Sequence, residues 1–283
     1  MVDLADVSVV IPAFNEEHGI GAVVERLRAR HAFGELIVVD DGSSDATAAR
    51  AEAAGARVLR HPYNKGNGAA VKTGIRAARG DVVLLMDADG QHDPDEALRL
   101  LEPLETHDMV IGARAAGDQG ATRALGNAIF KALASWLTGR PIPDLTSGFR
   151  AARRERLLEI LHLLPNGFSY PTTSCLALMK AGHSVGFVPI KAGRRVGRSK
   201  IRVLRDGVKF LLIILKIVTL YSPLKVFFPI SLAAFVLGVA YGVQNVVAHG
   251  KIPMGAALLI QLAVVVFLFG LISEQIASDQ DRQ

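Results

Sequence analysis

The sequence predicts an α/β fold, in which a mainly parallel sheet covered by helices is followed by an apolar helical hairpin. Two observations support this prediction. Short apolar runs alternate with helical patterns from Val7 to about Pro189, and two long uncharged apolar stretches lie near the end of the chain. Of the 283 residues 50% are hydrophobic, which suits one α/β domain with an appendage and is too apolar for a purely soluble enzyme.

The expected strands and helices follow from composition and boundaries. Runs rich in Val and Ile, bounded by Gly, Asp or Pro, predict strands at residues 7–11, 35–39, 57–60, 82–86 and 109–111. The segments between them predict helices at residues 19–30, 46–54, 68–78 and 95–104. Because the strand runs are apolar on both faces, this alternation predicts parallel strands with helices covering the sheet.

Acidic residues follow two of the predicted strands, as Asp40-Asp41-Gly42 and Asp87-Ala88-Asp89. Parallel sheets bind ligands beyond the carboxyl ends of their strands, so these segments mark a candidate site. The two carboxylates of the second segment can hold a hard divalent cation that also binds diphosphate oxygens, and Gln91 could add a neutral oxygen. Mg²⁺ or Mn²⁺ suits this oxygen-only set, and zinc is disfavoured without Cys or clustered His.

Structural roles are open for the same residues. Acidic pairs at strand ends are often loop caps, and Ser44 or Asp45 fits an N-cap of the helix beginning near Ala46. Capping by Asp45 and ligand binding by Asp41 are compatible. His92 is expected to be a solvated loop residue, and the alternative is that its side chain supports a metal ligand. Near the first strand, Pro12 also fits the end of a strand, Phe14 a core position, and Glu16 a partner of the helix dipole.

The chain changes character near Arg202. Residues 203–220 keep basic residues between apolar ones, which predicts helices lying in a membrane interface. Residues 226–248 and 254–272 carry no formal charge, and each stretch is close to the roughly 20 residues that cross the hydrocarbon core as a helix. The short link between them predicts a hairpin. A buried soluble hairpin is the alternative, disfavoured because both stretches are apolar on nearly all faces.

Basic residues gather just before the first apolar stretch, and they suit anionic lipid head groups or a phosphate-bearing substrate. The cluster consists of Lys191, Arg194, Arg195, Arg198, Lys200, Arg202, Arg205 and Lys209. Together with Lys225, it predicts that this side of the hairpin is cytoplasmic. The protein is therefore expected in the cell membrane as a multi-pass protein with its α/β domain facing the cytoplasm.

These patterns give the expected domain boundaries. Residues 1–200 form the catalytic domain, residues 201–225 the juxtamembrane helices, and residues 226–283 the transmembrane hairpin with a short polar tail. The N-terminus lacks the pattern of a cleavable signal peptide, and Cys175, the one cysteine, cannot form an intrachain disulfide. The lipid bilayer is an expected partner, nucleic acid is not, and an oligomer is compatible with the sequence.

Seven motifs, taken in order, resemble those of a known family. They are Val10-Ile11-Pro12-Ala13-Phe14-Asn15-Glu16, Val38-Val39-Asp40-Asp41-Gly42-Ser43, Asn64-Lys65-Gly66-Asn67-Gly68, Asp87-Ala88-Asp89-Gly90-Gln91-His92, Ile111-Gly112-Ala113-Arg114, Asp144-Leu145-Thr146-Ser147-Gly148-Phe149-Arg150 and Gly197-Arg198-Ser199-Lys200. As a set, they resemble the family 2 glycosyltransferases of GT-A (Rossmann-like) fold. Within that family, they are similar to the dolichyl- and polyprenyl-phosphate mannose and glucose synthases, over residues from about 7 to 223.

The resemblance implies a hexose transfer from a nucleotide-sugar of GDP-mannose or UDP-glucose type to a polyprenyl or dolichyl phosphate, with Mg²⁺ or Mn²⁺. The residues that would hold the nucleoside are Pro12, Phe14 (a Tyr in many relatives), Glu16, Val39 and Asp41. Those that would contact the rest of the donor are Asp87, Ala88, Arg114, Arg194 and Lys200.

The resemblance also implies the metal and acceptor sites. Asp89 and Gln91, beside Asp87, would ligate the metal ion. Arg123 would meet the acceptor phosphate, and Asn127 stands where those enzymes carry a Ser. The residues implied in the transfer itself are Asp89, Arg114 and Arg123.

The chemistry fits this assignment. Transfer releases a nucleoside diphosphate, and a divalent cation with Arg and Lys stabilises the charge on the leaving oxygen. An acceptor phosphate is already anionic near neutral pH, so no strong base is needed. Asp144 is the candidate if a base exists, and a structural turn role suits it as well. One in-line displacement predicts inversion at the anomeric carbon.

Two other functions remain open. One is a membrane-bound family 2 transferase with another lipid or glycan acceptor. Processive members carry Gln-x-x-Arg-Trp, which disfavours that class because the only tryptophan, Trp136, follows Ala134-Ser135. The other is a non-catalytic nucleotide-sugar-binding membrane protein, against which the intact metal set and Arg114 argue.

Overall fold

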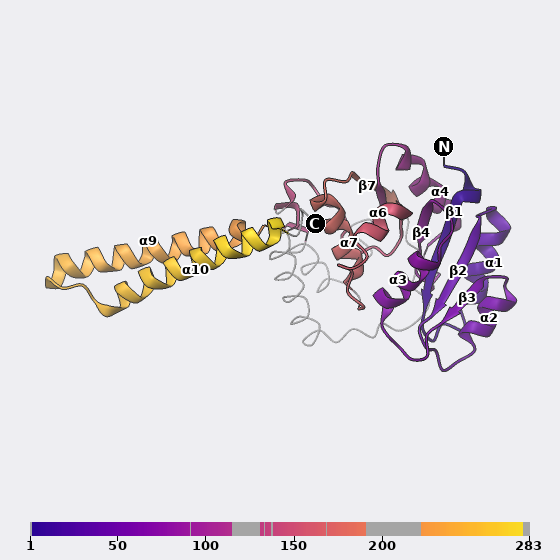
Figure 1. Ribbon diagram of the computed structural model, residues 1–283, viewed down its shortest axis with the longest axis horizontal. Helices are drawn as coiled ribbons and strands as arrows, with labels where there is room; N and C mark the ends of the chain where they lie inside the picture. Colours follow the sequence, from indigo (N-terminus) through magenta and orange to yellow (C-terminus); the bar gives the residue numbers. More distant parts are fainter. Residues whose placement is uncertain are drawn as a thin grey trace. The chain divides into compact units, whose positions relative to one another are not determined.

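The protein is described here by a computed structural model. The structure describes residues 2–90, 92–114, 131–132, 134–136, 138–167, 169–190 and 222–279. The chain divides into two compact units, Met1–Ile201 and Arg202–Gln283. Figure 1 shows the sheet and helices of the first unit and the two long helices of the second.

The first unit is built around a seven-stranded sheet with the strand order β3-β2-β1-β4-β6-β5-β7. Its strands are β1 Val7–Ala13, β2 Glu35–Asp40, β3 Arg57–Arg60, β4 Val82–Leu85, β5 Met109–Arg114, β6 Arg150–Arg153 and β7 Val185–Ile190. Neighbouring strands are parallel except at β6, which runs antiparallel to both β4 and β5. The predicted mainly parallel sheet is confirmed, and β6 and β7 add to the strands expected from sequence.

Helices cover both faces of this sheet, with α1 and α2 on one side and α3 on the other (Figure 1). The α-helices are α1 Ile20–Arg30, α2 Thr47–Ala53, α3 Asn67–Ala77, α4 Pro94–Leu101, α6 Arg154–Glu159 and α7 Tyr170–Lys180, and two short 3₁₀ helices are η1 Leu4–Asp6 and η2 Glu102–Glu105. The prediction of a single helix at residues 95–104 is wrong at the C-terminal end of that helix. Pro103 has no N–H to donate to the preceding turn, so the α-helix stops at Leu101 and η2 follows.

The core fixes the central strand on both faces. Every residue of β1 is buried, and Val9 and Ile11 pack in one cluster with Ile20 and Leu27 of α1. Val10 points to the opposite face, where Gly74 of α3 lies so close that a Cβ there would sit 2.2 Å from Val10 Cγ1. The carboxyl end of β1 is therefore held rigidly between two helix layers.

The second unit is a helical hairpin of α9 Pro223–His249 and α10 Met254–Asp279. Both helices are long and apolar enough to cross a membrane, and only 11% and 17% of their apolar windows are buried. Each helix extends beyond the stretch expected from sequence. α9 begins at Pro223 and ends at His249, and α10 continues past Ile272 through the polar residues at its end. Exposed apolar faces of this extent are unlike those of a soluble core hairpin.

The two long helices meet along small residues. Ser231 and Gly238 are the buried interior positions of α9, and the buried positions of α10 recur every seven residues: Ala256, Ala263, Gly270 and Ala277. A seven-residue period keeps one seam in contact along a left-handed helix pair, and small side chains let the backbones approach. At the start of α9, the Leu224 N–H donates to Glu274 Oε2 of α10 over 3.0 Å, which fixes the register of the pair.

Candidate functional site

The site predicted from sequence lies at the carboxyl ends of β1, β2 and β4. Pro12 and Val39 are register partners there, and the Asp41 N–H donates to Ala13 O over 2.9 Å. The loop after β1 is tied to the loop after β2, because the Asn15 N–H donates to Ser43 Oγ and the Glu16 N–H to Thr47 Oγ1, each over 2.9 Å. The residues expected to hold a nucleoside therefore lie on two joined loops at one edge of the sheet.

The expected N-cap of α2 at Ser44 or Asp45 is wrong, because the N-cap position is Ala46 and no side chain caps it. Asp45 instead accepts hydrogen bonds from both sides of this turn. Its Oδ1 accepts the N–H of Thr47, the first residue of α2, over 3.0 Å. Its Oδ2 accepts the Glu17 N–H over 3.3 Å. One carboxylate thus orders the start of α2 and the loop after β1.

Asp41 is buried, with its carboxylate engaged inside the protein. Oδ1 receives His61 Nδ1 over 2.7 Å and the Lys65 N–H over 2.9 Å, and Oδ2 receives the Gly66 N–H over 2.8 Å. His61 Nε2 lies 2.9 Å from Thr73 Oγ1 of α3. Asp41 therefore fixes the loop between β3 and α3, a role that its position after β2 could not reveal.

The glycines of the Asn64–Gly68 motif serve a close loop contact. Gly66 has a φ of 105°, and a Cβ on Gly68 would lie 2.1 Å from Pro165 O. The Ala69 N–H donates to Asn166 O over 3.1 Å. These glycines let residues 165–167 reach the start of α3, so the motif shapes the site through packing.

Asp87 and Asp89 follow β4, and both are half-buried. Asp87 Oδ2 lies 3.9 Å from His92 Nε2, and its carboxylate lies against Gly148, where a Cβ would come within 2.5 Å of Oδ2. Two accessible carboxylates without thiolates fit Mg²⁺ or Mn²⁺. No group of three or more His, Cys, Asp or Glu that could hold a metal occurs in the described part of the chain.

His92 corrects an expectation. It was expected in solvent, yet only 5% of its surface is exposed. Its ring stacks on Phe149, with centroids 4.6 Å apart and planes at 14°. The stacking partner lies 57 residues away in sequence, at the entrance to β6, which hydrophobic patterns did not predict.

Arg114, at the end of β5, binds the loop that precedes β6. Its Nε donates to Asp144 Oδ2 over 2.9 Å, and its Nη2 donates to Asp144 Oδ1 over 3.2 Å and to Thr146 Oγ1 over 2.7 Å. Burial lowers the pKa of Arg114, but Asp144 outweighs it with further attraction from Asp87 and Asp89, so the pKa is raised. The positive charge of Arg114 is thus attracted by both candidate metal ligands, which follow β4 at the same edge of the sheet.

Several predicted site residues lie outside the described residues. They are Gln91, Arg123, Asn127, Arg194 and Lys200. The interfacial helices expected at residues 203–220 also lie outside them.

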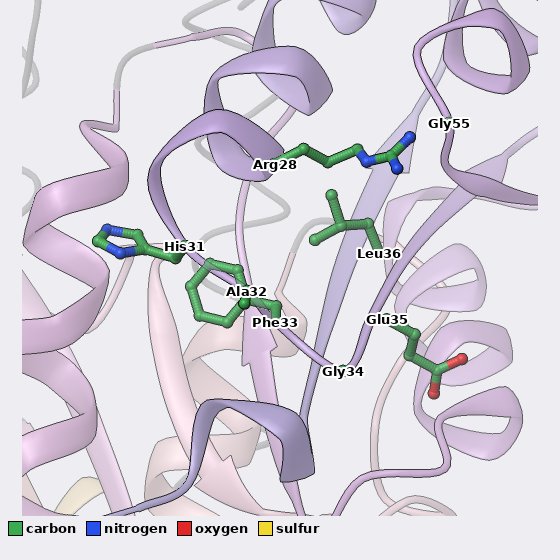
Figure 2. A pocket seen from close by; sticks show the side chains of 8 residues that line it. All are labelled: Arg28, His31, Ala32, Phe33, Gly34, Glu35, Leu36 and Gly55. Atoms are coloured by element: carbon green, nitrogen blue, oxygen red, sulfur yellow. The ribbon is translucent and has the colours of Figure 1, made fainter.

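The cavity of about 330 Å³ shown in Figure 2 lies elsewhere, and its lining includes Glu35 and Leu36 at the amino end of β2. It is bordered by Arg28, whose Nη1 donates to Ala54 O at the end of α2 over 3.3 Å. Because the acidic segments follow the opposite ends of the strands, this cavity is separate from the candidate site.

Residues 8–161 match the family described as Glycosyl transferase family 2, and residues 222–278 match the GtrB C-terminal hairpin. The chain belongs to the family 2 glycosyl transferases. This glycosyl transferase is 30% identical over 287 residues to glycosyltransferase AglJ of Haloferax volcanii, covering 96% of this chain and 94% of that one. It is 30% identical over 210 residues to an undecaprenyl-phosphate mannosyltransferase of Micrococcus luteus, covering 68% and 85%.

A solved structure supports the GT-A fold of this glycosyl transferase. Glucosyl-3-phosphoglycerate synthase from Mycobacterium tuberculosis, in complex with Mn²⁺, UDP and glucosyl-3-phosphoglycerate, matches with a TM-score of 0.60 and 26% identity. The match covers 74% of this chain and 79% of that one. Together with the exposed apolar hairpin, the comparisons identify this glycosyl transferase as a membrane protein.

Proposed function

We propose that this glycosyl transferase moves a hexose from a nucleotide-sugar, of GDP-mannose or UDP-glucose type, to a polyprenyl or dolichyl phosphate with inversion at the anomeric carbon. The observation that carries the proposal is that Asp87 and Asp89 follow the carboxyl end of β4 and Arg114 ends β5, at the same edge of the sheet. Polyprenyl phosphate as acceptor is supported by the name of the Micrococcus luteus relative.

The donor side uses anionic and cationic groups of the chain together. Asp87 and Asp89, with Gln91, would hold Mg²⁺ or Mn²⁺, which when bound neutralises charge on the diphosphate leaving group. Arg114 would bind the donor phosphates through Nη1, since Nε and Nη2 already donate to Asp144 and Thr146. Arg194 and Lys200 would approach the same diphosphate. Pro12, Phe14, Glu16, Val39 and Ala88 would border the nucleoside and sugar.

The acceptor side requires little base catalysis. Burial raises the pKa of Asp144, but the hydrogen bonds and charge of Arg114 outweigh burial and lower it. An ionised carboxylate with a low pKa is a weak base, which suits an acceptor phosphate that is already anionic. We assign Arg123 and Asn127 to the acceptor phosphate and Asp144 to the orientation of Arg114.

The membrane arrangement completes the proposal. Residues 1–200 form the catalytic domain, residues 201–225 the juxtamembrane segment, and residues 226–283 the hairpin and tail. Both long helices would span the cell membrane, with Lys225 and the preceding basic cluster on the cytoplasmic side. The polyprenyl chain of the acceptor would then lie in the same membrane that the hairpin spans.

A donor panel tests the proposal. The purified full-length protein is offered GDP-mannose, UDP-glucose and related nucleotide-sugars with undecaprenyl or dolichyl phosphate, and lipid products are followed by mass spectrometry. We expect a polyprenyl-phosphate hexose from at least one donor, lost with EDTA and restored by Mg²⁺ or Mn²⁺. Transfer only to a different lipid or glycan acceptor would contradict it.

A further inference from the structure

Arg150 is a wholly buried arginine beneath the candidate site. It is the first residue of β6, has no exposed surface and is among the largest fully buried side chains. In the sheet it pairs with Leu85 of β4 and Ile111 of β5. Leu85 is the last residue of β4 and precedes Asp87 by two positions, so Arg150 lies beside the end of β4 from which Asp87 follows.

The guanidinium of Arg150 is held only by neutral groups within the described ranges. Nη1 donates to Pro171 O over 2.7 Å and to Ser174 Oγ over 2.8 Å, and Nη2 donates to Ser147 O. Nε has no hydrogen-bond partner among the residues described. A buried cation without a contacting carboxylate is destabilising, so fold stability alone does not explain this residue.

Two acidic side chains of the site are close enough to attract the Arg150 guanidinium. Burial lowers the pKa of the Arg150 guanidinium, while nearby acidic groups, including Asp144 and Asp87, act in the other direction. Cys175, also close, is neutral because burial raises its pKa to about 12. An arginine stays protonated in proteins, so its buried positive charge attracts the Asp87 and Asp144 carboxylates.

Arg150 also holds the peptide on which Asp87 rests. It donates to Ser147 O, and the next residue, Gly148, touches the Asp87 carboxylate. Phe149, one residue further on, stacks on His92. The hydrogen bond from Arg150 therefore sets the position of the backbone that supports the first candidate metal ligand.

We propose that Arg150 is a positioning residue of the transfer site, which fixes the Ser147–Gly148 peptide against Asp87 and supplies a buried positive charge toward the anionic donor. This inference rests on the proposed function, because it assumes that Asp87 takes part in binding a metal-diphosphate complex. It assigns a role to a side chain that need not touch the substrate.

Three variants of the full-length protein separate this role from a structural one. Arg150→Met removes the charge and all donors, Arg150→Lys keeps the charge, and Ser174→Ala removes one neutral acceptor. We measure melting temperature, kcat and KM for the donor, and Mn²⁺ affinity in the presence of the nucleoside diphosphate by electron paramagnetic resonance. A structural role alone would change melting temperature and leave the kcat and Mn²⁺ affinity of the folded protein unchanged.

We expect Arg150→Met to weaken Mn²⁺ binding about 10-fold or more and to lower kcat by a similar factor, with partial rescue in Arg150→Lys and little change in Ser174→Ala. Wild-type kcat and Mn²⁺ affinity in folded Arg150→Met would overturn the inference. If Arg150→Met does not fold, Arg150→Lys decides: weaker Mn²⁺ binding at a normal melting temperature supports the role, and unchanged binding overturns it. A wild-type protein that transfers no sugar would instead count against the proposed function, while its Mn²⁺ affinity still tests Arg150.

Discussion

Arg114 donates two parallel hydrogen bonds to Asp144, from Nε to Oδ2 over 2.9 Å and from Nη2 to Oδ1 over 3.2 Å. The Asp144 side chain is 3% exposed, whereas that of Arg114 is 24% exposed. This planar pair joins the end of β5 to the loop before β6. It fixes the orientation of the guanidinium before any donor arrives, which is how a bidentate carboxylate positions an arginine.

Asp144→Asn is expected to lower stability at neutral pH by about 3 kcal/mol, because it leaves Arg114 partly buried without its charge partner. The folded protein lowers the pKa of Asp144, so the stabilisation is fully present above the unfolded pKa of about 3.9 and is lost as pH falls through the folded value. Melting temperatures from pH 7 down to pH 3 test this. The variant should lose less stability than the wild-type protein as the pH falls. Identical pH dependence of the two melting temperatures would contradict the pairing of Asp144 with Arg114.

Gly148→Ala should displace Asp87, a proposed metal ligand, without unfolding the protein. The new Cβ would lie 2.5 Å from Asp87 Oδ2, and the end of a half-exposed side chain can move away. We expect the Mn²⁺ concentration for half-maximal activity to rise about 10-fold or more. Gly167→Ala is the matched control, since nothing lies within 4 Å of its added methyl group. Equal Mn²⁺ dependence in both variants would remove Asp87 from the metal site.

Asp41→Asn tests the anchored loop between β3 and α3. An amide oxygen cannot replace both carboxylate oxygens, so at least one buried donor from His61, Lys65 or Gly66 is left unpaired, at a cost of about 1–3 kcal/mol. We expect a lower melting temperature and a higher KM for the donor. Hydrogen exchange at the Lys65 and Gly66 amides should become faster, and unchanged protection there would show that Asp41 does not hold the loop.

Gly238→Val tests the seam of the membrane hairpin. A Cβ at this position would lie 2.9 Å from Ile260 Cγ1, so a larger side chain forces α9 and α10 apart, at about 1–3 kcal/mol. Ala240→Val, at an exposed position of the same helix, is the control. Thermal unfolding in detergent, followed by circular dichroism, should separate the two variants. Equal midpoints would mean that the seam contributes little.

The sequence predicted those parts of the fold that depend on local pattern. β1, β2 and β4 were predicted because their buried faces produce continuous apolar runs. β6 was not, because Arg150–Arg153 reads Arg-Ala-Ala-Arg, and its burial comes from two neighbouring strands rather than from its own side chains. Long-range pairing of this kind leaves no periodic signal in a single sequence.

The candidate site, like the fold, was predictable where it depends on local pattern and not where it depends on long-range contacts. The positions of Asp87 and Asp89 follow from the rule that parallel sheets bind ligands at the carboxyl ends of strands. The inward orientation of Asp41 does not, because its partner His61 is 20 residues away in sequence. Likewise, Gly148 and Phe149 were recognised as parts of a motif, but their contacts with Asp87 and His92 depend on how β6 enters the sheet.

The most direct test of the account asks whether the aspartates after β4 hold a cation against the donor. Mn²⁺ binding is measured for the wild-type protein and for Asp89→Ala, each with and without nucleoside diphosphate. Electron paramagnetic resonance reports free and bound Mn²⁺, and melting temperature confirms that the variant is folded. The account predicts tight binding to wild-type protein that strengthens with nucleoside diphosphate, and about 100-fold weaker binding to a folded Asp89→Ala that no longer transfers sugar. Equal Mn²⁺ affinity and undiminished turnover in Asp89→Ala would contradict it.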